Sequence, residues 1–339
     1  MSFLRSRRGA ILLGLLVSAA CLAVLAGKVD ERRLVAALAA AAVGPLALSL
    51  VTKALGFVCL ALRSRVLFGV FGRWPAGVFL RAHLLGFGGN VLLPLRLGEL
   101  LRVGELARRT AVAPSSCLGA VVIERALDSL WLLLVALTLP AVVAFDLPLP
   151  STIAASFAAL VAALALALWL SARPARLAAV IGFAGRLFGR RAADVLGRAA
   201  YGFAAGLTVL ASPRRFVAAS FWTLGYWASG ALGVWLWMRA FALDLPWYAA
   251  PTVVVFLAVG AALPAAPGFL GTYHLFLMSG LMVFGVDADR AAAVAVAGHF
   301  VATVPAALVA LLLFFDELRR GPAAVAPPPA GPAPDVPHW

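Results

Sequence analysis

Long apolar stretches separated by short polar segments dominate the chain. Each is about 17–30 residues long, enough for a helix to cross a hydrocarbon layer of ~30 Å. This pattern predicts an all-α polytopic membrane protein with about seven or eight crossing helices, the first of them uncleaved. The stretches typical of full crossings are 10–26, 34–60, 116–145, 151–170, 216–240 and 291–315.

Two other apolar stretches are interrupted. Residues 76–95 carry Arg81, His83 and a glycine cluster and break at Pro94, so we expect a re-entrant hairpin that enters and leaves on the cytoplasmic side. Residues 247–284 form two apolar arms around an uncharged Pro/Gly segment. These arms either meet inside the membrane or make two full crossings, and the pattern leaves both open.

The two interrupted stretches share a short motif. Pro94–Glu99 reads PLRLGE and Pro267–Thr272 reads PGFLGT, so both contain P-x-x-L-G followed by a helical pattern. Interrupted hydrophobic segments at matching places in two halves are typical of an inverted repeat with a binding site where the halves meet. The motif therefore raises the hypothesis of such a repeat, with the site between the two breaks.

The remaining segments complete the domain organisation. Residues 173–200 combine an apolar stripe of helical spacing with a basic remainder, which predicts one amphipathic helix in the membrane interface. Residues 1–320 then form a single integral membrane domain. The Pro/Ala-rich residues 321–339 are expected to be disordered, because they have no apolar face to bury.

Composition agrees with a membrane protein and indicates its orientation. Hydrophobic residues make up 64% of the 339 residues and charged residues 12%, with a mean hydropathy of +1.02. The net charge of +14 comes mainly from arginines assigned to short segments between crossings, Arg63 and Arg65 among them. Because such residues stay on the cytoplasmic side, both termini are expected there, and the charge does not indicate a nucleic-acid partner. The three cysteines stand singly, so no metal or other cofactor is expected.

Charged residues inside the predicted crossings are the candidates for function. Glu124 lies about 12–15 Å into its stretch, close to the bilayer centre, with Arg125 and Asp128 beside it. Each such charge costs roughly 2.5–3.5 kcal/mol unless partners or water offset it. Arg125 and Asp128 can form a purely structural pair. We favour one buried network that faces a central cavity and also includes Arg96 and Glu99.

Two further polar residues lie within apolar stretches. Lys53 stands near one end of its stretch, so we expect its ammonium group to snorkel to the membrane surface. His299 lies about 14 Å into the last stretch. It either lines a cavity or makes a helix-packing hydrogen bond, and the pattern favours neither.

Three motifs at their present spacing resemble one family of membrane proteins. They are N-x-x-L-P-x-R-x-G-E-L-x-R at Asn90–Arg102, E-R-x-x-D at Glu124–Asp128 and L-P-x-x-P-G-x-x-G at Leu263–Gly271. Together they make most of the chain similar to the lysylphosphatidylglycerol synthase transmembrane-domain family, also called flippase-like, in its stand-alone form. One position departs from the family, which often has Glu where this chain has His274.

The resemblance implies movement of a polar-headed, phosphate-bearing lipid between the leaflets of a bacterial cytoplasmic (inner) membrane. The lipid would be a membrane phospholipid or a polyprenyl lipid or glycolipid, and an envelope-lipid biosynthetic enzyme is a further candidate partner. Arginines beside a glycine-broken helix suit a phosphate independently. The residues expected to bind or move the lipid are Asn90, Pro94, Arg96, Gly98, Glu99, Arg102, Glu124, Arg125, Asp128, Pro264, Pro267, Gly268, Gly271, His274 and His299.

Two other function classes stay open. A non-transporting accessory protein of a glycolipid, hopanoid or aminoacyl-phospholipid pathway fits the same resemblance. A polyprenyl-phosphate-dependent glycosyltransferase would use acids in the first external segment, where Asp30 and Glu31 stand beside two arginines. Family members that transfer lysine do so with a separate soluble domain, so we expect no enzymatic activity from this chain.

Overall fold

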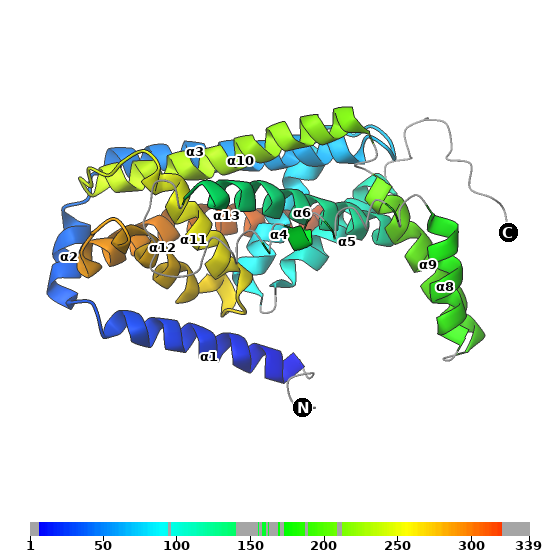
Figure 1. The fold of residues 1–339 in the computed structure, drawn as a ribbon, viewed down its shortest axis with the longest axis horizontal. Coiled ribbons are helices and arrows are strands. Elements are labelled where there is room, and N and C mark those ends of the chain that lie inside the picture. Colours follow the sequence, from blue (N-terminus) through cyan, green and yellow to red (C-terminus); the bar gives the residue numbers. More distant parts are fainter. Residues whose placement is uncertain are drawn as a thin grey trace.

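A computed structural model shows the protein as an elongated bundle of helices (Figure 1). It describes residues 7–93, 96–139, 155, 158–160, 162, 169, 173–186, 189–208 and 212–320. All regular elements in these ranges are helices, which confirms the predicted all-α membrane fold. The predicted crossing at 151–170 lies largely outside the described residues, and the tail at 321–339 lies entirely outside them.

The chain begins with a bent pair of helices. α1 (Arg7–Ala26) leads into α2 (Glu31–Ala39), which turns away from it by 89° and lies across one end of the bundle (Figure 1). Asp30 fixes this bend, because its side chain accepts a hydrogen bond from the backbone of α2 at 3.0 Å. Its own backbone N–H donates to Asp289 Oδ1 at 2.7 Å, which ties the bend to the last helix.

The predicted crossing at 34–60 is wrong in its boundaries. α2 ends within that stretch and α3 (Val43–Phe68) is a separate helix. Pro45 lies in the first turn of α3, where the missing N–H has no intrahelical partner to lose. The backbone N–H of Ala42 donates to the carbonyl oxygen of Ala240 at 2.8 Å, so the break is held against a neighbouring helix.

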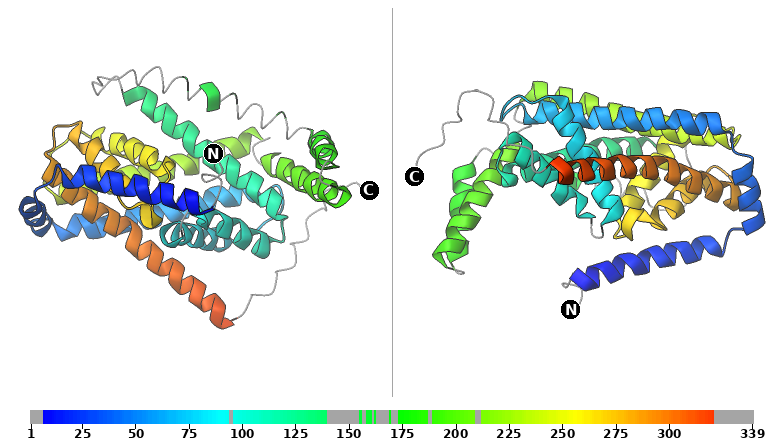
Figure 2. Two further views of the ribbon diagram at one scale, coloured as in Figure 1. Left: turned by 90° about the horizontal axis from the view of Figure 1, so that it is seen from below. Right: turned by 180° about the vertical axis from the view of Figure 1, so that it is seen from behind.

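Four long helices form the centre of the fold. α3 packs along α10 (Pro213–Ala240), with α6 (Pro114–Thr138) and α13 (Ala288–Arg320) around them (Figures 1 and 2). α3 and residues 288–316 are each long and apolar enough to cross a membrane, and the bent α1–α2 pair adds a third candidate if it is one span. The predicted total of crossings therefore stays a prediction.

The first interrupted stretch is one arm of a helical hairpin. α4 (Ala76–Leu92) is continuous through its glycines, and α5 (Gly98–Thr110) returns alongside it. The prediction that 76–95 itself turns back is wrong, because the glycines serve packing rather than a break. A Cβ on Gly98 would lie 2.0 Å from the carbonyl oxygen of Gly86, so only glycine permits this approach.

The second interrupted stretch also folds back on itself. α11 (Ala249–Ala262) and α12 (Thr272–Met282) pack against each other, joined by a turn that contains the 3₁₀ helix η6 (Pro267–Phe269). α12 also contacts α1 and α13. The two arms therefore lie side by side, and both predicted alternatives, arms that meet inside the membrane and two full crossings, stay predictions.

The predicted single amphipathic helix at 173–200 is two helices. α8 (Pro174–Gly185) and α9 (Arg190–Leu207) pack together at one end of the molecule (Figure 1). Gly189 separates them with φ 103°, a conformation that favours glycine. α9 docks on α6, where Gly119 and Gly206 face each other so closely that a Cβ on either would lie within 3 Å of the other's backbone.

Candidate functional site

The turns of the two hairpins lie against each other. Arg96, in the turn of the first hairpin, donates from Nη2 to the carbonyl oxygen of Leu263 at 3.5 Å. Its guanidinium carbon lies 5.4 Å from the ring centroid of Phe269 in the second turn, within the range of a cation–π contact. α4 also packs against η6. The two interrupted stretches therefore meet, as their shared motif predicts.

The two turns share an unusual backbone conformation. The third residue of P-x-x-L-G has φ 55° at Arg96 and φ 58° at Phe269. Positive φ is uncommon for a residue with a side chain and costs of order 1–3 kcal/mol. Gly268 and Gly271 have φ 72° and 84°, which glycine adopts freely. Matching conformations at matching positions support the hypothesis that the turns are structurally equivalent.

A cavity of about 250 Å³, here called the hairpin cavity, lies between the turns. Arg96 is the charged residue among its lining residues, and it forms no ion pair within the described part of the chain. α1 closes one side, where Ser18 Oγ accepts a hydrogen bond from the Ala266 backbone at 2.8 Å. Its lining residues are Gly14, Asn90, Leu93, Arg96, Ala262, Leu263, Pro264, Ala265, Ala266 and Phe269.

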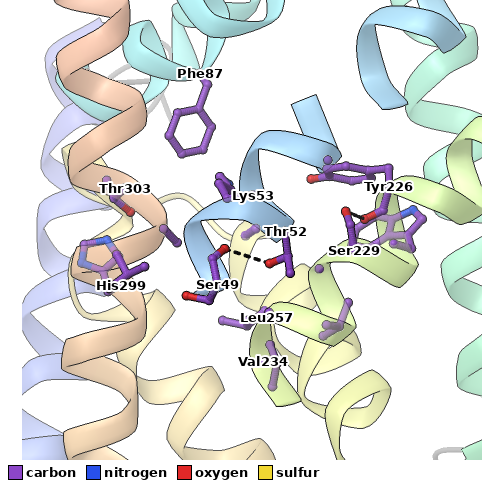
Figure 3. Close-up of a pocket in the computed structure, with 18 of the residues that line it drawn as sticks. Ser49, Thr52, Lys53, Phe87, Tyr226, Ser229, Val234, Leu257, His299 and Thr303 are labelled. Atoms are coloured by element: carbon purple, nitrogen blue, oxygen red, sulfur yellow. Dashed lines mark hydrogen bonds between the residues drawn. The ribbon is translucent and has the colours of Figure 1, made fainter. Parts of the chain in front are cut away.

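A second cavity of about 310 Å³, here called the central cavity, lies between α3, α4, α10, α11, α12 and α13. Figure 3 shows the side chains around it. Most of its wall is apolar or aromatic. The hydroxyl of Ser49 accepts a hydrogen bond from Trp237 Nε1 at 2.9 Å, which holds α3 against α10. The polar residues that line the central cavity are Ser49, Thr52, Lys53, Asn90, Tyr226, Ser229, Tyr273, His299 and Thr303.

Lys53 brings a positive charge into the central cavity. It lies about 15 Å along α3 from the start of the helix. Its ammonium nitrogen is 4.4 Å from the ring centroid of Phe87 and 5.3 Å from that of Phe57, so two aromatic faces hold it. The prediction that Lys53 snorkels to the surface is therefore wrong. It lines the cavity instead, and no carboxylate is among the described lining residues.

Four buried charged residues on α3, α5 and α6 form what we call the ion network: Arg63, Arg102, Glu124 and Asp128. Arg63 is hydrogen bonded to Asp128 and lies 3.7 Å from Glu124, and Arg102 is hydrogen bonded to Glu124. The side chains of Arg63 and Glu124 are 0% exposed. The network contains two cations and two anions, so it is neutral. Such pairing is what allows charges to stay buried.

Uncharged polar groups complete the ion network. Ser64 Oγ donates to Glu124 Oε1 at 2.5 Å and lies 2.8 Å from His83 Nε2. His83 Nε2 is also 3.2 Å from Arg102 Nη2. The network therefore joins α3, α4, α5 and α6, and it fixes the first hairpin to the long helices.

Three of the predicted members of the network, Arg125, Glu99 and Arg96, lie outside its buried centre. Arg125 is at its edge, with a side chain 50% exposed and 3.5 Å from Asp128. Glu99 is also peripheral, 35% exposed and 3.6 Å from Arg102. Arg96 instead contacts the second hairpin. The predicted network is therefore wrong in most of its members: Glu124 and Asp128 are buried in it, but Arg63 and Arg102 are their partners. The prediction that it faces a central cavity is also wrong, because none of these four residues is among the described lining residues of either cavity.

A second ionic cluster fastens the other end of the first hairpin. Glu105 on α5 accepts from Arg81 Nε at 2.8 Å and is also hydrogen bonded to Arg108 and Arg109. Arg81 Nη2 donates to the carbonyl oxygen of Leu313 at 3.0 Å, so the cluster reaches α13. Arginine–carboxylate contacts therefore hold α5 at two places, at Arg102 through Glu124 and at Glu105 through Arg81.

The two histidines lie together beside the second turn. His299 Nε2 is 2.8 Å from the carbonyl oxygen of Gly268, and its ring centroid is 4.7 Å from that of His274. His299 also lines the central cavity, so both of its open interpretations apply at once. Pro267 begins η6, and Pro94 lies outside the described residues.

A family model described as "Lysylphosphatidylglycerol synthase TM region" matches residues 11–310. The chain belongs to this family. The match contains both hairpins, both cavities and the ion network, and it confirms the resemblance carried by the three motifs. Membership in the lysylphosphatidylglycerol synthase transmembrane family indicates a membrane protein with a lipid-related function. Comparison with curated proteins found no match.

Three polar residues of this family member were not among the predicted site residues. Arg63 closes an apolar stretch and therefore resembles a residue of a polar connecting segment, although it is fully buried in α3. Lys53 has no charged neighbour in sequence, so nothing local indicates a cavity. His83 lies on the buried face of α4. The available signal was the pair Glu124 and Asp128, four residues apart, which requires cations from other helices.

Proposed function

We propose that this protein moves a phosphate-bearing lipid between the leaflets of a bacterial cytoplasmic membrane and that it is not an enzyme. The observation that carries the proposal is Arg96 in the hairpin cavity. It is a cation that forms no ion pair with the described residues, held in a rare backbone conformation where two helical hairpins meet. Broken helices that face each other inside a membrane protein are typical of transporters.

The charges of the site fit a phosphate headgroup. An arginine guanidinium binds phosphate through charge-assisted hydrogen bonds. Among the described residues, the one hydrogen-bond partner of the Arg96 side chain is the carbonyl oxygen of Leu263, at a long distance of 3.5 Å. Arg63 and Arg102 are already neutralised by carboxylates, so in this proposal they support the hairpin instead of binding lipid. The acyl chains stay in the surrounding bilayer while the headgroup crosses the protein.

The basic ends of the protein support the proposed orientation. α8, α9 and the last turn of α13 lie toward the same end of the bundle (Figure 2). α9 contributes exposed arginines there, and α13 contributes the exposed Arg319. The positive-inside rule then favours a cytoplasmic position for this end and for both termini. The glycosyltransferase alternative has less support, because the Asp30 carboxylate is occupied in capping α2.

Reconstitution into liposomes tests the proposal. Fluorescent phosphatidylglycerol is placed in both leaflets, and an impermeant reductant bleaches the outer one. We expect wild-type protein to expose the inner-leaflet lipid and Arg96→Leu to lose this activity. Arg65→Leu, which removes an exposed arginine from the end of α3, is the matched control and should behave as wild type. An accessory protein or an enzyme lacking its donor substrate would leave the inner leaflet protected, and that result would overturn the proposal.

A further inference from the structure

The charge that the described residues bring to the central cavity is positive. Lys53 is the charged residue among its described lining residues, and no aspartate or glutamate accompanies it. Lys53 also forms no ion pair elsewhere in the described chain, and its ammonium group lies over the rings of Phe57 and Phe87. The cavity thus offers a cation and no anion.

The two cavities are neighbours. Asn90 and Phe269 line both of them, so these residues form the partition between the hairpin cavity and the central cavity. Arg96 lies on one side of this partition against Phe269, and Lys53 lies on the other side against Phe87. An anionic group that leaves Arg96 and passes the partition therefore reaches Lys53 next.

We propose that the central cavity, through Lys53, binds the phosphodiester of a lipid whose headgroup has a net negative charge, and that it disfavours headgroups carrying ammonium groups. This inference rests on the proposed lipid transport and names its substrate class. A phosphodiester neutralises Lys53 in a half-buried site. An added ammonium group finds no carboxylate partner there and is repelled by Lys53. The rings of Phe57 and Phe87 are already in contact with Lys53. An ammonium group at another aromatic ring of the cavity would still have no carboxylate partner among the described lining residues.

The expected substrate is thus of the phosphatidylglycerol type, with one phosphate and a neutral polar substituent. Lysylphosphatidylglycerol, whose headgroup carries two ammonium groups, is expected to be a poor substrate. Although the family is named after lysylphosphatidylglycerol, we therefore expect this chain to move phosphatidylglycerol and not its lysylated product.

Binding is tested without transport. The chain has two lysines, Lys28 and Lys53, so Lys28→Arg leaves Lys53 as the only lysine side chain. Its reductive methylation is followed by mass spectrometry in phosphatidylcholine nanodiscs. Added phosphatidylglycerol at about ten times its Kd should slow methylation about tenfold, whereas lysylphosphatidylglycerol and soluble glycerol phosphate should not. In a Lys53→Arg protein, the exposed Lys28 serves as the control and should react at the same rate with every lipid.

Each other result overturns a stated part of the inference. If phosphatidylglycerol leaves the methylation rate of Lys53 unchanged, Lys53 does not bind this lipid. Equal protection by lysylphosphatidylglycerol removes the charge selectivity. Protection by glycerol phosphate without protection by the lipid means that the site takes a small soluble anion.

The liposome assay then separates this inference from the proposed function. Wild-type protein should move phosphatidylglycerol at least tenfold faster than lysylphosphatidylglycerol. Lys53→Met should lose the movement of phosphatidylglycerol, and Lys53→Arg should keep most of it. The control variant Lys28→Met should move phosphatidylglycerol at the wild-type rate. Movement of phosphatidylglycerol by Lys53→Met at the wild-type rate overturns the inference while lipid transport stands. Protection of Lys53 by phosphatidylglycerol in a protein that moves no lipid upholds the binding site and overturns the transport function.

Discussion

Replacing Arg63 by Met is expected to destabilise the protein strongly. Arg63 lies between two carboxylates, hydrogen bonded to Asp128 and 3.7 Å from Glu124, and its side chain is fully buried. Met is also unbranched and has a helix propensity similar to that of Arg, so the substitution removes mainly the charge. It leaves one buried cation, Arg102, to serve two buried anions. The neutral ion network then has a net negative charge in the interior.

The expected cost follows from the geometry. At an effective dielectric constant of about 20, charges 3.7 Å apart interact by about 4.5 kcal/mol. Removing one partner of a buried pair typically costs about 3–5 kcal/mol, because the other charge remains desolvated. Removing Asp128 as well restores neutrality. The double variant Arg63→Met/Asp128→Leu should therefore be less destabilised than the sum of the two single variants, by about 1–3 kcal/mol.

Reversible unfolding by SDS in mixed micelles measures these free energies. Wild type, both single variants and the double variant form a complete cycle. Arg125→Leu is the matched arginine control, and its half-exposed pair with Asp128 at 3.5 Å should contribute only about 0–1 kcal/mol. Strict additivity of the two single variants would contradict the coupled network, and so would a larger loss for Arg125→Leu than for Arg63→Met.

Three other predictions concern the architecture. Cysteines at Arg73 and Ala111, both exposed at the open end of the first hairpin, should be labelled from the same side of the membrane in intact cells; opposite sides would exclude the hairpin. Gly98→Ala places a Cβ 2.0 Å from a backbone oxygen of α4, so lipid exchange should fall while membrane insertion persists, and Gly104→Ala, which meets nothing within 4 Å, should be neutral. Gly119→Val should detach α9 from α6, because a Cβ there lies 2.4 Å from a backbone oxygen of α9; proteolysis within α8–α9 should become faster, and an unchanged rate would contradict this contact.

The sequence predicts the class of fold well, because hydropathy alone determines that long apolar helices cross a bilayer. It predicts helix ends less well. The break before α3 depends on Pro45 in a first turn and on a backbone contact with α10, and neither appears in a hydropathy pattern. The separation of α8 from α9 depends on one glycine, Gly189, in a chain with many glycines.

The sequence predicted the part of the site that carries the repeated P-x-x-L-G motif. The motif at Pro94 and Pro267 indicated that the two turns meet, and they do. The partners of Glu124 and Asp128 were not predictable in the same way, since Arg63 lies 65 residues before Asp128 in the chain. The sequence shows that two carboxylates on one helix face need cations, but the packing of α3 against α6 decides which cations they receive.

One measurement tests the central claim that the lipid headgroup passes between the two hairpin turns. In a background with Cys21, Cys59 and Cys117 replaced by Ala, new cysteines at Leu93 and Ala265, which both line the hairpin cavity, are joined by a short bifunctional thiol cross-linker. The cross-linker is a bis-methanethiosulfonate, which forms a disulfide with each cysteine and is released by a reductant. We predict that lipid exchange in liposomes stops on cross-linking and returns on reduction, because the linker fills the cavity and holds the turns together. Exchange at the same rate in the fully cross-linked and the reduced protein would contradict this path.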